Sequence, residues 1–240
     1  MMLKKALVTG SAVGIGRAIA LHLASQGFDV AFHYKNSAEA AQKASQEAAT
    51  YGVKSIVLQA DLTKADRAKS LVENAAEQLG GLSVVINNVG NYLEKAIEQI
   101  SIEEWHQMLD SNLNATFYVT QTAIPYLKAA GSGRIVNFAF ASAQHLIAGD
   151  EQTAYRIAKT GIIIYTKSLG KELAKNKITA NIVAPGVAEN SVGLDETIPL
   201  LPHKRPATLK EICHAVDFFL SPESDYITGQ IMEIAGGWRL

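Results

Sequence analysis

The sequence alternates along its whole length between short β-branched runs and longer amphipathic segments, and this alternation restricts the fold more than any other feature. The expected strands are Ala6–Thr9, Val30–Tyr34, Ser55–Gln59, Val84–Asn87, Ile135–Phe138, Thr179–Ala184 and Ile231–Ile234. The expected helices are Ile15–Gln26, Ser37–Tyr51, Lys64–Leu79, Ile102–Ala130 (as two helices), Gln152–Ala174 and Thr208–Leu220. Continuous apolar runs are typical of buried parallel strands, and the crossovers between such strands need helices. The pattern predicts an α/β protein with a doubly wound parallel sheet of about seven strands and helices on both faces.

No Pro/Ser linker or repeat divides the chain, so a single domain over residues 1–240 is expected. The longest segment without a clear period is 186–207, which we interpret as a substrate loop because long loops in compact domains are commonly functional. Its Leu194, Ile198, Leu200 and Leu201 suggest a partly apolar substrate, or packing of the loop itself.

Composition excludes several classes of function. The formal net charge of -1 favours neither a nucleic acid nor an anionic membrane as partner. No run approaches the roughly 18 apolar residues that span a bilayer, so we expect a cytoplasmic protein. Cys213 is the only cysteine and is expected to be a buried, inert thiol. No metal site is expected.

A glycine-rich turn, Thr9-Gly10-Ser11-Ala12-Val13-Gly14-Ile15-Gly16, joins the first strand to the first helix. Glycine permits positive φ and close approach of a ligand, and a helix start offers free N–H groups and a positive dipole end to a diphosphate. Ala12 and Ile15 stand where the usual dinucleotide pattern has its second and third glycines. A tight turn without a ligand is the alternative. The position at the first strand–helix junction favours a nucleotide site in a Rossmann fold.

The end of the second strand bears on which nucleotide would bind. An NAD site usually has an acidic residue here for the ribose 2′-hydroxyl, but no acid occurs between Val30 and Ala38. The Lys35 ammonium and the Ser37 hydroxyl suit a 2′-phosphate instead. The sequence therefore predicts NADP(H) rather than NAD(H), unless Lys35 is only a solvated loop charge.

Tyr155 and Lys159 lie at i and i+4 on one expected helix and therefore share a face. A free tyrosine has a pKa of about 10, and a nearby ammonium lowers it, which makes the phenol usable as a general acid–base. Alone, such a pair is common on ordinary helices. The pair of Tyr155 and Lys159 indicates catalysis only in combination with the other motifs.

Together these motifs resemble the short-chain dehydrogenase/reductase family. Five features follow that family's order and spacing: the glycine turn, Asn87-Asn88-Val89-Gly90, Asn112, Tyr155-x-x-x-Lys159 and Pro185-Gly186. The C-terminal stretch from Ser221 to Gly237 resembles the 3-oxoacyl-carrier-protein reductase group, and the resemblance covers nearly the whole chain.

The resemblance, together with the end of the second strand, gives the predicted cofactor-binding residues: Gly10, Ser11, Gly14, Ile15, Gly16, Tyr34, Lys35, Ser37, Asp61, Leu62, Asn88, Gly90, Tyr155, Lys159, Pro185 and Gly186. The resemblance places Ser11 near the adenosine phosphate. It also implies that Asp61 accepts from the adenine amino group, with capping of the helix that begins near Lys64 as the alternative. Asn87 is expected to hold neighbouring strands together.

The resemblance implies a catalytic set of Asn112, Ser142, Tyr155 and Lys159, in which Asn112 anchors a water that links Lys159 to solvent. The serine is ambiguous. Counting forward from Gly133 puts Phe140 at the family's serine position, whereas counting back from Tyr155 by the family's usual separation gives Ser142. An insertion before Ser142, as a bulge, would restore the site and is the favoured expectation. An insertion in the loop Gln144–Gln152 would leave Phe140 there.

A second departure follows Pro185-Gly186, where Asn190 replaces the family's threonine and Ser191 is next. His145 is either a pocket residue or an exposed loop histidine. The resemblance implies hydride transfer between NADP(H) and a carbonyl or alcohol, in the direction of ketone reduction on a 3-oxoacyl or similar small ketone, by a homotetramer or homodimer. The alternative is an NADP(H)-binding sensor or scaffold with weak or no catalysis.

Overall fold

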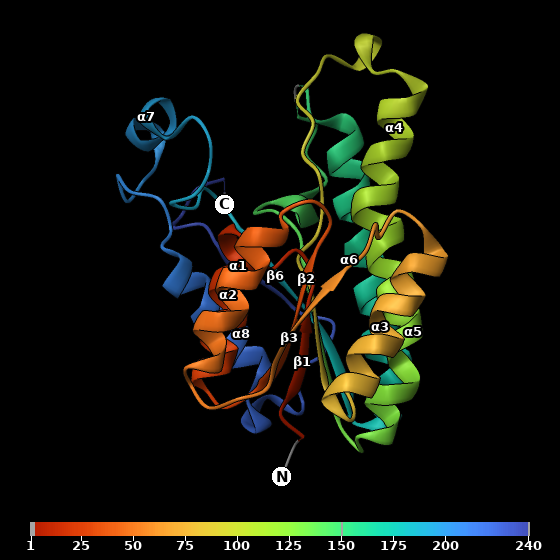
Figure 1. The fold of residues 1–240 in the computed structure, drawn as a ribbon. Coiled ribbons are helices and arrows are strands. Elements are labelled where there is room, and N and C mark those ends of the chain that lie inside the picture. The colour runs from red at the N-terminus through yellow and green to blue at the C-terminus, as the bar shows by residue number, and fades with distance from the viewer. Residues whose placement is uncertain (1–2, 150, 240) are drawn as a thin grey trace.

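The computed structural model describes residues 3–149 and 151–239 and shows one parallel sheet with helices on both sides (Figure 1). The seven strands are paired in the order β3-β2-β1-β4-β5-β6-β7. They are β1 Lys5–Val8, β2 Asp29–Tyr34, β3 Ser55–Gln59, β4 Val84–Asn87, β5 Gly133–Phe138, β6 Ile178–Pro185 and β7 Ile231–Ile234. The strand order reverses between β1 and β4, and a ligand of such a sheet binds beyond the carboxyl ends of the strands at that point.

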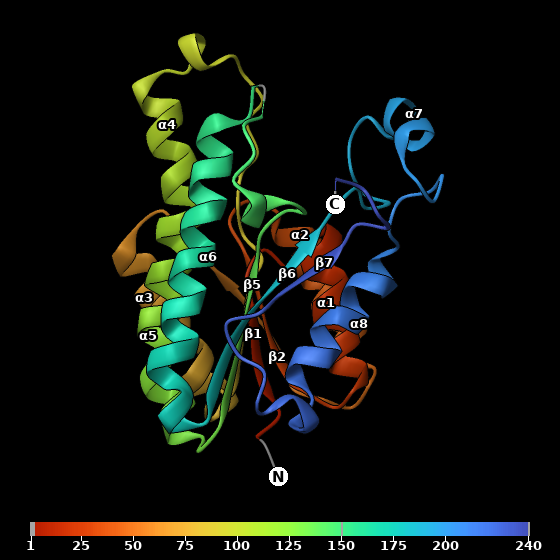
Figure 2. The same cartoon turned by 180° about the vertical axis from the view of Figure 1, so that it is seen from behind.

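The α-helices are α1 Gly14–Ser25, α2 Ala38–Ala49, α3 Ala65–Leu79, α4 Ile102–Met108, α5 Ala115–Ala129, α6 Thr153–Leu173, α7 Leu194–Thr197 and α8 Leu209–Leu220. A π-helical segment, Leu109–Asn114, joins α4 to α5. Short 3₁₀ turns occupy Ile97–Gln99, Ala143–His145, Ala174–Asn176, Ile198–Leu200 and Pro222–Ser224. Helices α1, α2 and α8 cover one face of the sheet, and α3, α5 and α6 cover the other (Figures 1 and 2).

Each face of the sheet buries its own apolar cluster. Phe32, Ile86 and Phe219 belong to the cluster beneath α1 and α8. Leu7 and Leu127 belong to the cluster beneath α3 and α5. Burial of both faces explains why the strand sequences are continuous apolar runs rather than alternating ones.

The predicted fold class is confirmed, and the two main differences both concern irregular segments. The expected helix pair Ile102–Ala130 is a single helical run containing the π-helical turn. The loop 186–207, which lacks a sequence period, contains α7 and a 3₁₀ turn. Within the described part of the chain, no helix combines the length and apolar character that crossing a membrane requires.

Candidate active site

The conformation of the glycine turn depends on Gly10, Gly14 and Gly16. Gly10 and Gly14 have φ of 63° and 58°, the left-handed region that favours glycine. A Cβ on Gly16 would collide with the Gly10 carbonyl, so only glycine lets α1 start this close to β1. Val13 provides no side-chain cap for α1, which leaves the first-turn amides available to an anion.

The side chain of Asn88 holds the turn from the β4 side. Its Nδ2 donates to the carbonyls of Thr9 and Gly10, both at 3.2 Å. Asn87 donates to Thr120 and Asn137, which confirms the expectation that it ties neighbouring elements together.

A cavity of about 490 Å³ opens beside the turn, at the point where the strand order reverses. Its lining includes Gly10, Lys35 and Leu62, together with Glu103 and His106 of α4. Lys35, Asp61 and Leu62, which the sequence predicts to bind the adenosine end of a cofactor, all lie in its wall, and the contribution of α4 was not foreseen. We refer to this cavity below as the adenosine cavity, after that prediction.

Lys35 and Asp61 meet at the mouth of this cavity. The Lys35 ammonium lies 2.9 Å from Asp61 Oδ2, and Asp61 Oδ1 accepts from the amide and hydroxyl of Thr63. Burial favours the neutral form of the Asp61 carboxyl group, but the hydrogen bonds from Lys35 and Thr63 outweigh this effect and hold the pKa of Asp61 below its ordinary value. The alternative in which Asp61 caps α3 is not observed, because the helix begins at Ala65 with Lys64 as its N-cap.

Ser11, Tyr34 and Ser37, which are also predicted to bind the cofactor, differ in how far they are buried. Ser11 is fully buried and its hydroxyl donates to the Val8 carbonyl, so that side chain supports the turn from inside. Tyr34 is half-buried at the end of β2, and Ser37 is exposed at the N-cap of α2.

Tyr155 and Lys159 stand in the first half of α6, as predicted. The Lys159 ammonium lies 5.7 Å from the centre of the Tyr155 ring and donates to the Phe138 carbonyl at 3.0 Å. Burial lowers the pKa of Lys159 to about 8. Lys159 is therefore still mostly an ammonium at neutral pH.

The pKa of Tyr155 moves opposite to the direction that the sequence predicts. Burial, with a smaller contribution from the neighbouring Tyr92, raises it to about 12. Burial dominates because the Lys159 ammonium faces the ring and is bonded to a carbonyl. Tyr155 is thus a neutral phenol that holds its proton at neutral pH.

Asn112 lies in the π-helical segment and faces Lys159 across Gly90. A Cβ on Gly90 would collide with Asn112 Oδ1 and would lie 3.2 Å from Lys159 Nζ, so both atoms converge on one point that only glycine leaves open. Asn112 Nδ2 donates to the Asn91 and Met108 carbonyls, whereas its buried Oδ1 has no partner among the described residues. Such a buried acceptor beside an ammonium suits a bridging water.

Two aromatic side chains pack against Tyr155, and sequence reasoning missed one of them, Tyr92. The Phe140 ring lies 5.6 Å from the Tyr155 ring, centre to centre, and the Tyr92 ring meets it edge-on at 5.1 Å. The Arg156 guanidinium covers Phe140 at 5.0 Å from the ring centre. The sequence signal for Phe140 was that counting forward from Gly133 puts it at the family's serine position.

Ser142 follows β5 in a left-handed turn with φ of 69°. Its amide donates to Glu233 of β7 at 3.0 Å. Pairing of β5 with β6 continues without a bulge, since the amides of Ala139 and Ala141 donate to the carbonyls of Val183 and Pro185 in turn. The bulge that would restore Ser142 to the family's serine position is therefore not present before Ala141.

The end of β6 supplies the other side of the site. The Gly186 amide donates to the Ile234 carbonyl at 3.0 Å, which ties Pro185-Gly186 to β7. A Cβ on Gly14 would lie 2.9 Å from Asn190 Nδ2, so Asn190 folds back onto the glycine turn. The Ser191 hydroxyl instead accepts from the Ala188 amide.

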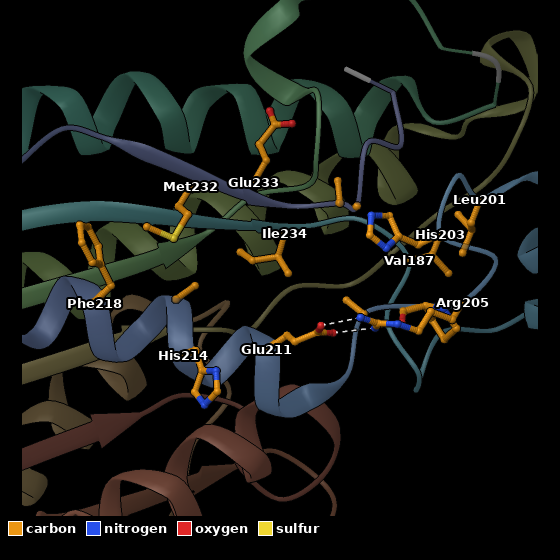
Figure 3. Close-up of a pocket in the computed structure, with 15 residues that line it drawn as sticks. Val187, Leu201, His203, Arg205, Glu211, His214, Phe218, Met232, Glu233 and Ile234 are labelled. Atoms are coloured by element: carbon orange, nitrogen blue, oxygen red, sulfur yellow. Dashed lines mark hydrogen bonds and ion pairs between the residues drawn. The ribbon is translucent and has the colours of Figure 1, made fainter.

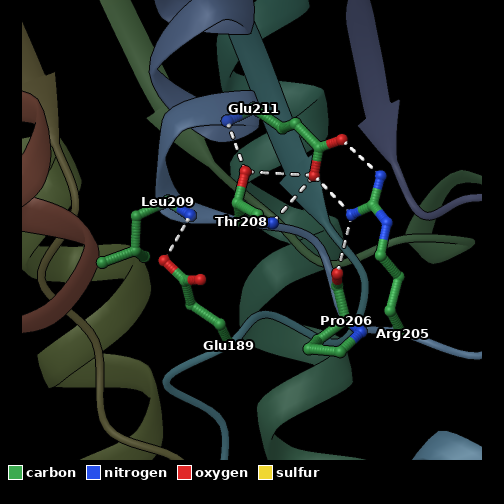
Figure 4. Close-up of polar contacts among 6 residues, drawn as sticks. All are labelled: Glu189, Arg205, Pro206, Thr208, Leu209 and Glu211. Atoms are coloured by element: carbon green, nitrogen blue, oxygen red, sulfur yellow. Dashed lines mark hydrogen bonds and ion pairs between the residues drawn. The ribbon is translucent and has the colours of Figure 1, made fainter.

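The loop 186–207 is held at its base by polar contacts to the start of α8 (Figure 4). Glu189 Oε1 accepts from the Leu209 amide at 2.9 Å. Glu211 accepts from the Thr208 amide at 2.8 Å and pairs with Arg205 at 2.7 Å.

A second cavity, of about 470 Å³, lies behind the loop base between α8 and β7 (Figure 3). Leu201 is buried and contributes to its wall, so this loop leucine packs inside the protein. His145 is exposed, and Cys213 is buried with a pKa raised to about 11 by burial and by Asp217. Neither residue belongs to the site around Tyr155.

The described residues fit a dinucleotide. The glycine turn is a cradle that side chains at Gly14 and Gly16 would fill, and a free helix start lies beside it. The cavity at Lys35 and Asp61 extends from one end of the turn.

Comparison with known proteins agrees with this geometry. Residues 10–239 match a family model described as Enoyl-(Acyl carrier protein) reductase. The chain is 35% identical to 3-oxoacyl-[acyl-carrier-protein] reductase FabG of Staphylococcus aureus, over 98% of both chains.

Two similar solved structures are a short-chain dehydrogenase from Burkholderia cenocepacia in complex with NADP and acetoin dehydrogenase YohF from Salmonella typhimurium. The first has a TM-score of 0.92 and 30% identity, covering 98% of each chain. The second has a TM-score of 0.90 and 31% identity, covering 98% of this chain and 96% of the other. Motifs, sheet order and relatives agree, and the chain is an oxidoreductase that belongs to the short-chain dehydrogenase/reductase family.

Proposed function

We propose that this protein reduces a small ketone, of the 3-oxoacyl or a similar class, with NADPH. The observation that carries the proposal is the convergence of Tyr155, Lys159, Asn112 and Gly90 beyond the glycine turn. The FabG relative supports a 3-oxoacyl substrate. When bound, the dinucleotide supplies the hydride.

The choice of NADP(H) over NAD(H) is supported by the residues at the end of β2. Lys35 presents an ammonium at the adenosine cavity and is more than half exposed, so it can pair with a 2′-phosphate. The Asp61 carboxylate beside it is already neutralised by Lys35. The complex of the Burkholderia cenocepacia relative with NADP is in agreement.

Tyr155 is the proposed proton donor to the substrate oxygen. Because its phenol keeps its proton at neutral pH, the residue is suited to protonating a developing alkoxide, which supports the direction of reduction. Lys159 would stabilise the phenolate that remains, and Asn112 would hold the water through which that phenolate regains a proton. Gly90 keeps the space for this relay open.

We further propose that Phe140, not Ser142, occupies the place of the family's serine. This revises the favoured expectation from the sequence. The regular pairing as far as Ala141 and the contact of the Phe140 ring with Tyr155 support it. Tyr155 would then polarise the substrate oxygen alone, beside an apolar wall.

Assembly into a homotetramer or homodimer is proposed on the exposed apolar side chains of α5 and α6. Phe117 and Ile164 are 43% and 66% exposed. Burial of such side chains favours association.

The proposed chemistry is tested by Tyr155→Phe. This variant keeps the ring and removes the hydroxyl, so NADPH should bind with little change while turnover of small 3-oxoacyl esters falls about 10²-fold or more. NADPH consumption measures turnover, and calorimetry measures binding. Unchanged turnover in the variant would overturn the mechanism. Binding without turnover in the wild-type protein would favour the sensor or scaffold alternative, for which the Phe140 position is the motive.

A further inference from the structure

The imidazole of His33 lies where the glycine turn, β2 and the end of β3 meet. It is 2% exposed, at the penultimate residue of β2. Nδ1 is 3.0 Å from the Gly10 amide, and Nε2 is 3.1 Å from the Ala60 carbonyl oxygen. Since a carbonyl only accepts, Nε2 carries the proton and Nδ1 accepts from Gly10. The neutral ring therefore satisfies both nitrogens at once.

The main chain of His33 is also hydrogen-bonded to the glycine turn. Its amide donates to Ser11 Oγ, and its carbonyl accepts from the Ser11 amide, both at 2.9 Å. The Ser11 hydroxyl continues the chain of bonds to the Val8 carbonyl. Two consecutive residues of the turn are thus fixed by one residue of β2.

On its other side the ring reaches the segment that lines the adenosine cavity. Ala60 precedes Asp61 and Leu62, and all three line that cavity together with His33 itself. The imidazole is consequently a direct connection between the turn expected to carry the diphosphate and the segment expected to carry the adenine.

We propose that His33 is a positioning residue for the dinucleotide, which holds the glycine turn and the segment 60–63 at a fixed separation through a neutral imidazole. The inference rests on the proposed cofactor site and goes beyond it by assigning the residue that sets its geometry. His33 touches no reacting atom. It acts through the Gly10 amide and the Ala60 carbonyl.

The same geometry makes the arrangement sensitive to acid. Burial lowers the pKa of His33 to about 4, against smaller opposing effects of the Ala60 bond and of Asp61. The charged and titratable groups that line the cavity with His33 are Lys35 after β2 and Asp61 after β3, together with Glu103, His106 and Asp110 of the helical run across the cavity. An imidazolium would turn a second N–H towards the Gly10 N–H, and the turn would lose its acceptor.

Substitutions can separate the two bonds of the ring. His33→Phe keeps a ring but removes both bonds, whereas His33→Asn keeps an acceptor near the position of Nδ1 and is too short to reach Ala60. Val30→Ala is the matched control, because Val30 is fully buried on the same strand and packs in the core. It should lower stability without touching the turn.

The measurements are Kd for NADPH by calorimetry at pH 7, and KM and kcat with a small 3-oxoacyl ester. We expect His33→Phe to raise Kd and KM for NADPH about tenfold with kcat within about twofold, and His33→Asn to raise Kd by about threefold or less. Val30→Ala should match the wild-type protein in Kd. An equal Kd for His33→Phe and wild type, or an equal loss in Val30→Ala, overturns the proposal.

A pH series provides a readout that does not depend on His33→Phe folding. The ratio of Kd in the wild type to Kd in His33→Asn removes the titration of the cofactor phosphate and of Asp61, which both proteins share. This ratio should rise as the pH falls from 6 towards 4 (about the range in which a group of this pKa begins to titrate). Parallel curves overturn the proposal. Failure of the wild-type protein to bind NADPH overturns the proposed cofactor itself, a result distinct from equal binding by wild type and variant.

Discussion

At the scale of single residues, the surroundings of Tyr155 separate this chain from the pattern it otherwise follows. The rings of Tyr92 and Phe140 pack against the Tyr155 ring, while the Lys159 ammonium lies over it. Burial therefore determines the protonation of Tyr155 more than the ammonium does. The side chains packed around Tyr155 therefore set the protonation state in which its phenol can act.

Substitutions at Phe140 test how strongly the neighbours of Tyr155 affect catalysis. Phe140→Ser places a hydroxyl beside Tyr155, and we expect kcat for a small ketone to rise about tenfold because a second donor stabilises the developing oxyanion. Phe140→Ala controls for the space released, and should not show this gain. NADPH consumption under saturating substrate measures kcat.

Ser142→Ala completes the comparison. If Phe140 occupies the serine position, this variant should retain wild-type kcat within about twofold. A loss on the scale of about 10²-fold, as for an oxyanion donor, would instead return Ser142 to the catalytic set and contradict our assignment.

Sequence alone left this point open for a physical reason. A strand repeats every two residues, so moving the site from Phe140 to Ser142 leaves the same alternation of faces. No periodicity argument can distinguish the two placements. The hydrogen bonds from the amides of Ala139 and Ala141 to β6 distinguish the two placements, and these bonds can be seen only in the folded structure.

At the scale of elements, the loop 186–207 contacts both the glycine turn and the start of α8. Asn190 meets Gly14, and its neighbour Glu189 accepts from the first amide of α8. The two contacts come from adjacent residues, so we expect a change in the attachment of the loop to α8 to alter its contact with the glycine turn.

Glu189→Ala should uncouple them. We expect KM for NADPH to rise a few-fold, on the scale of a lost helix-capping bond of about 1 kcal/mol, and limited proteolysis within 190–206 to become faster. Glu189→Gln keeps an acceptor oxygen and serves as the control, with values near wild type. Equal KM and equal cleavage in Glu189→Ala and wild type would contradict the coupling.

At the scale of the whole molecule, the doubly wound parallel sheet was predictable because buried parallel strands and amphipathic crossovers have distinct patterns. The order of the strands was not predicted and comes from the structure. The grouping of Tyr155 with Lys159 could also be anticipated, since the two residues have a fixed spacing on one helix. Their roles in catalysis stay predictions. His33 and Tyr92 could not be found, because a histidine in an apolar strand and a loop tyrosine carry no pattern. Their contacts come from segments distant in the sequence.

Acid stability is the property of the whole chain in which His33 should be visible. In the unfolded chain His33 takes up a proton near the ordinary histidine pKa of 6.5, and in the folded protein only near 4, so the unfolded state binds more protons between these values. The free energy of unfolding should therefore fall as pH decreases from about 6.5 to about 4, by up to about 3 kcal/mol from this residue.

Urea unfolding at several pH values measures this slope. His33→Asn has no group to titrate in that interval, so its free energy of unfolding should fall less than that of the wild type. Identical slopes in the two proteins would show that His33 is not responsible.

The π-helical segment 109–114 has a consequence for how the long helical run can change. A π-turn contains one residue more than an α-turn, which rotates everything before it by about 100° relative to everything after it. Because of this offset, α4 presents Glu103 and His106 to the adenosine cavity while α5 buries Val119 and Leu127 against the core. Removing one residue from this segment would scarcely shorten the run, but it would rotate α4 away from the cavity. The number of residues in segment 109–114 therefore sets the orientation of α4 relative to α5. A family member with one residue fewer here would present a different face of α4 to its cofactor.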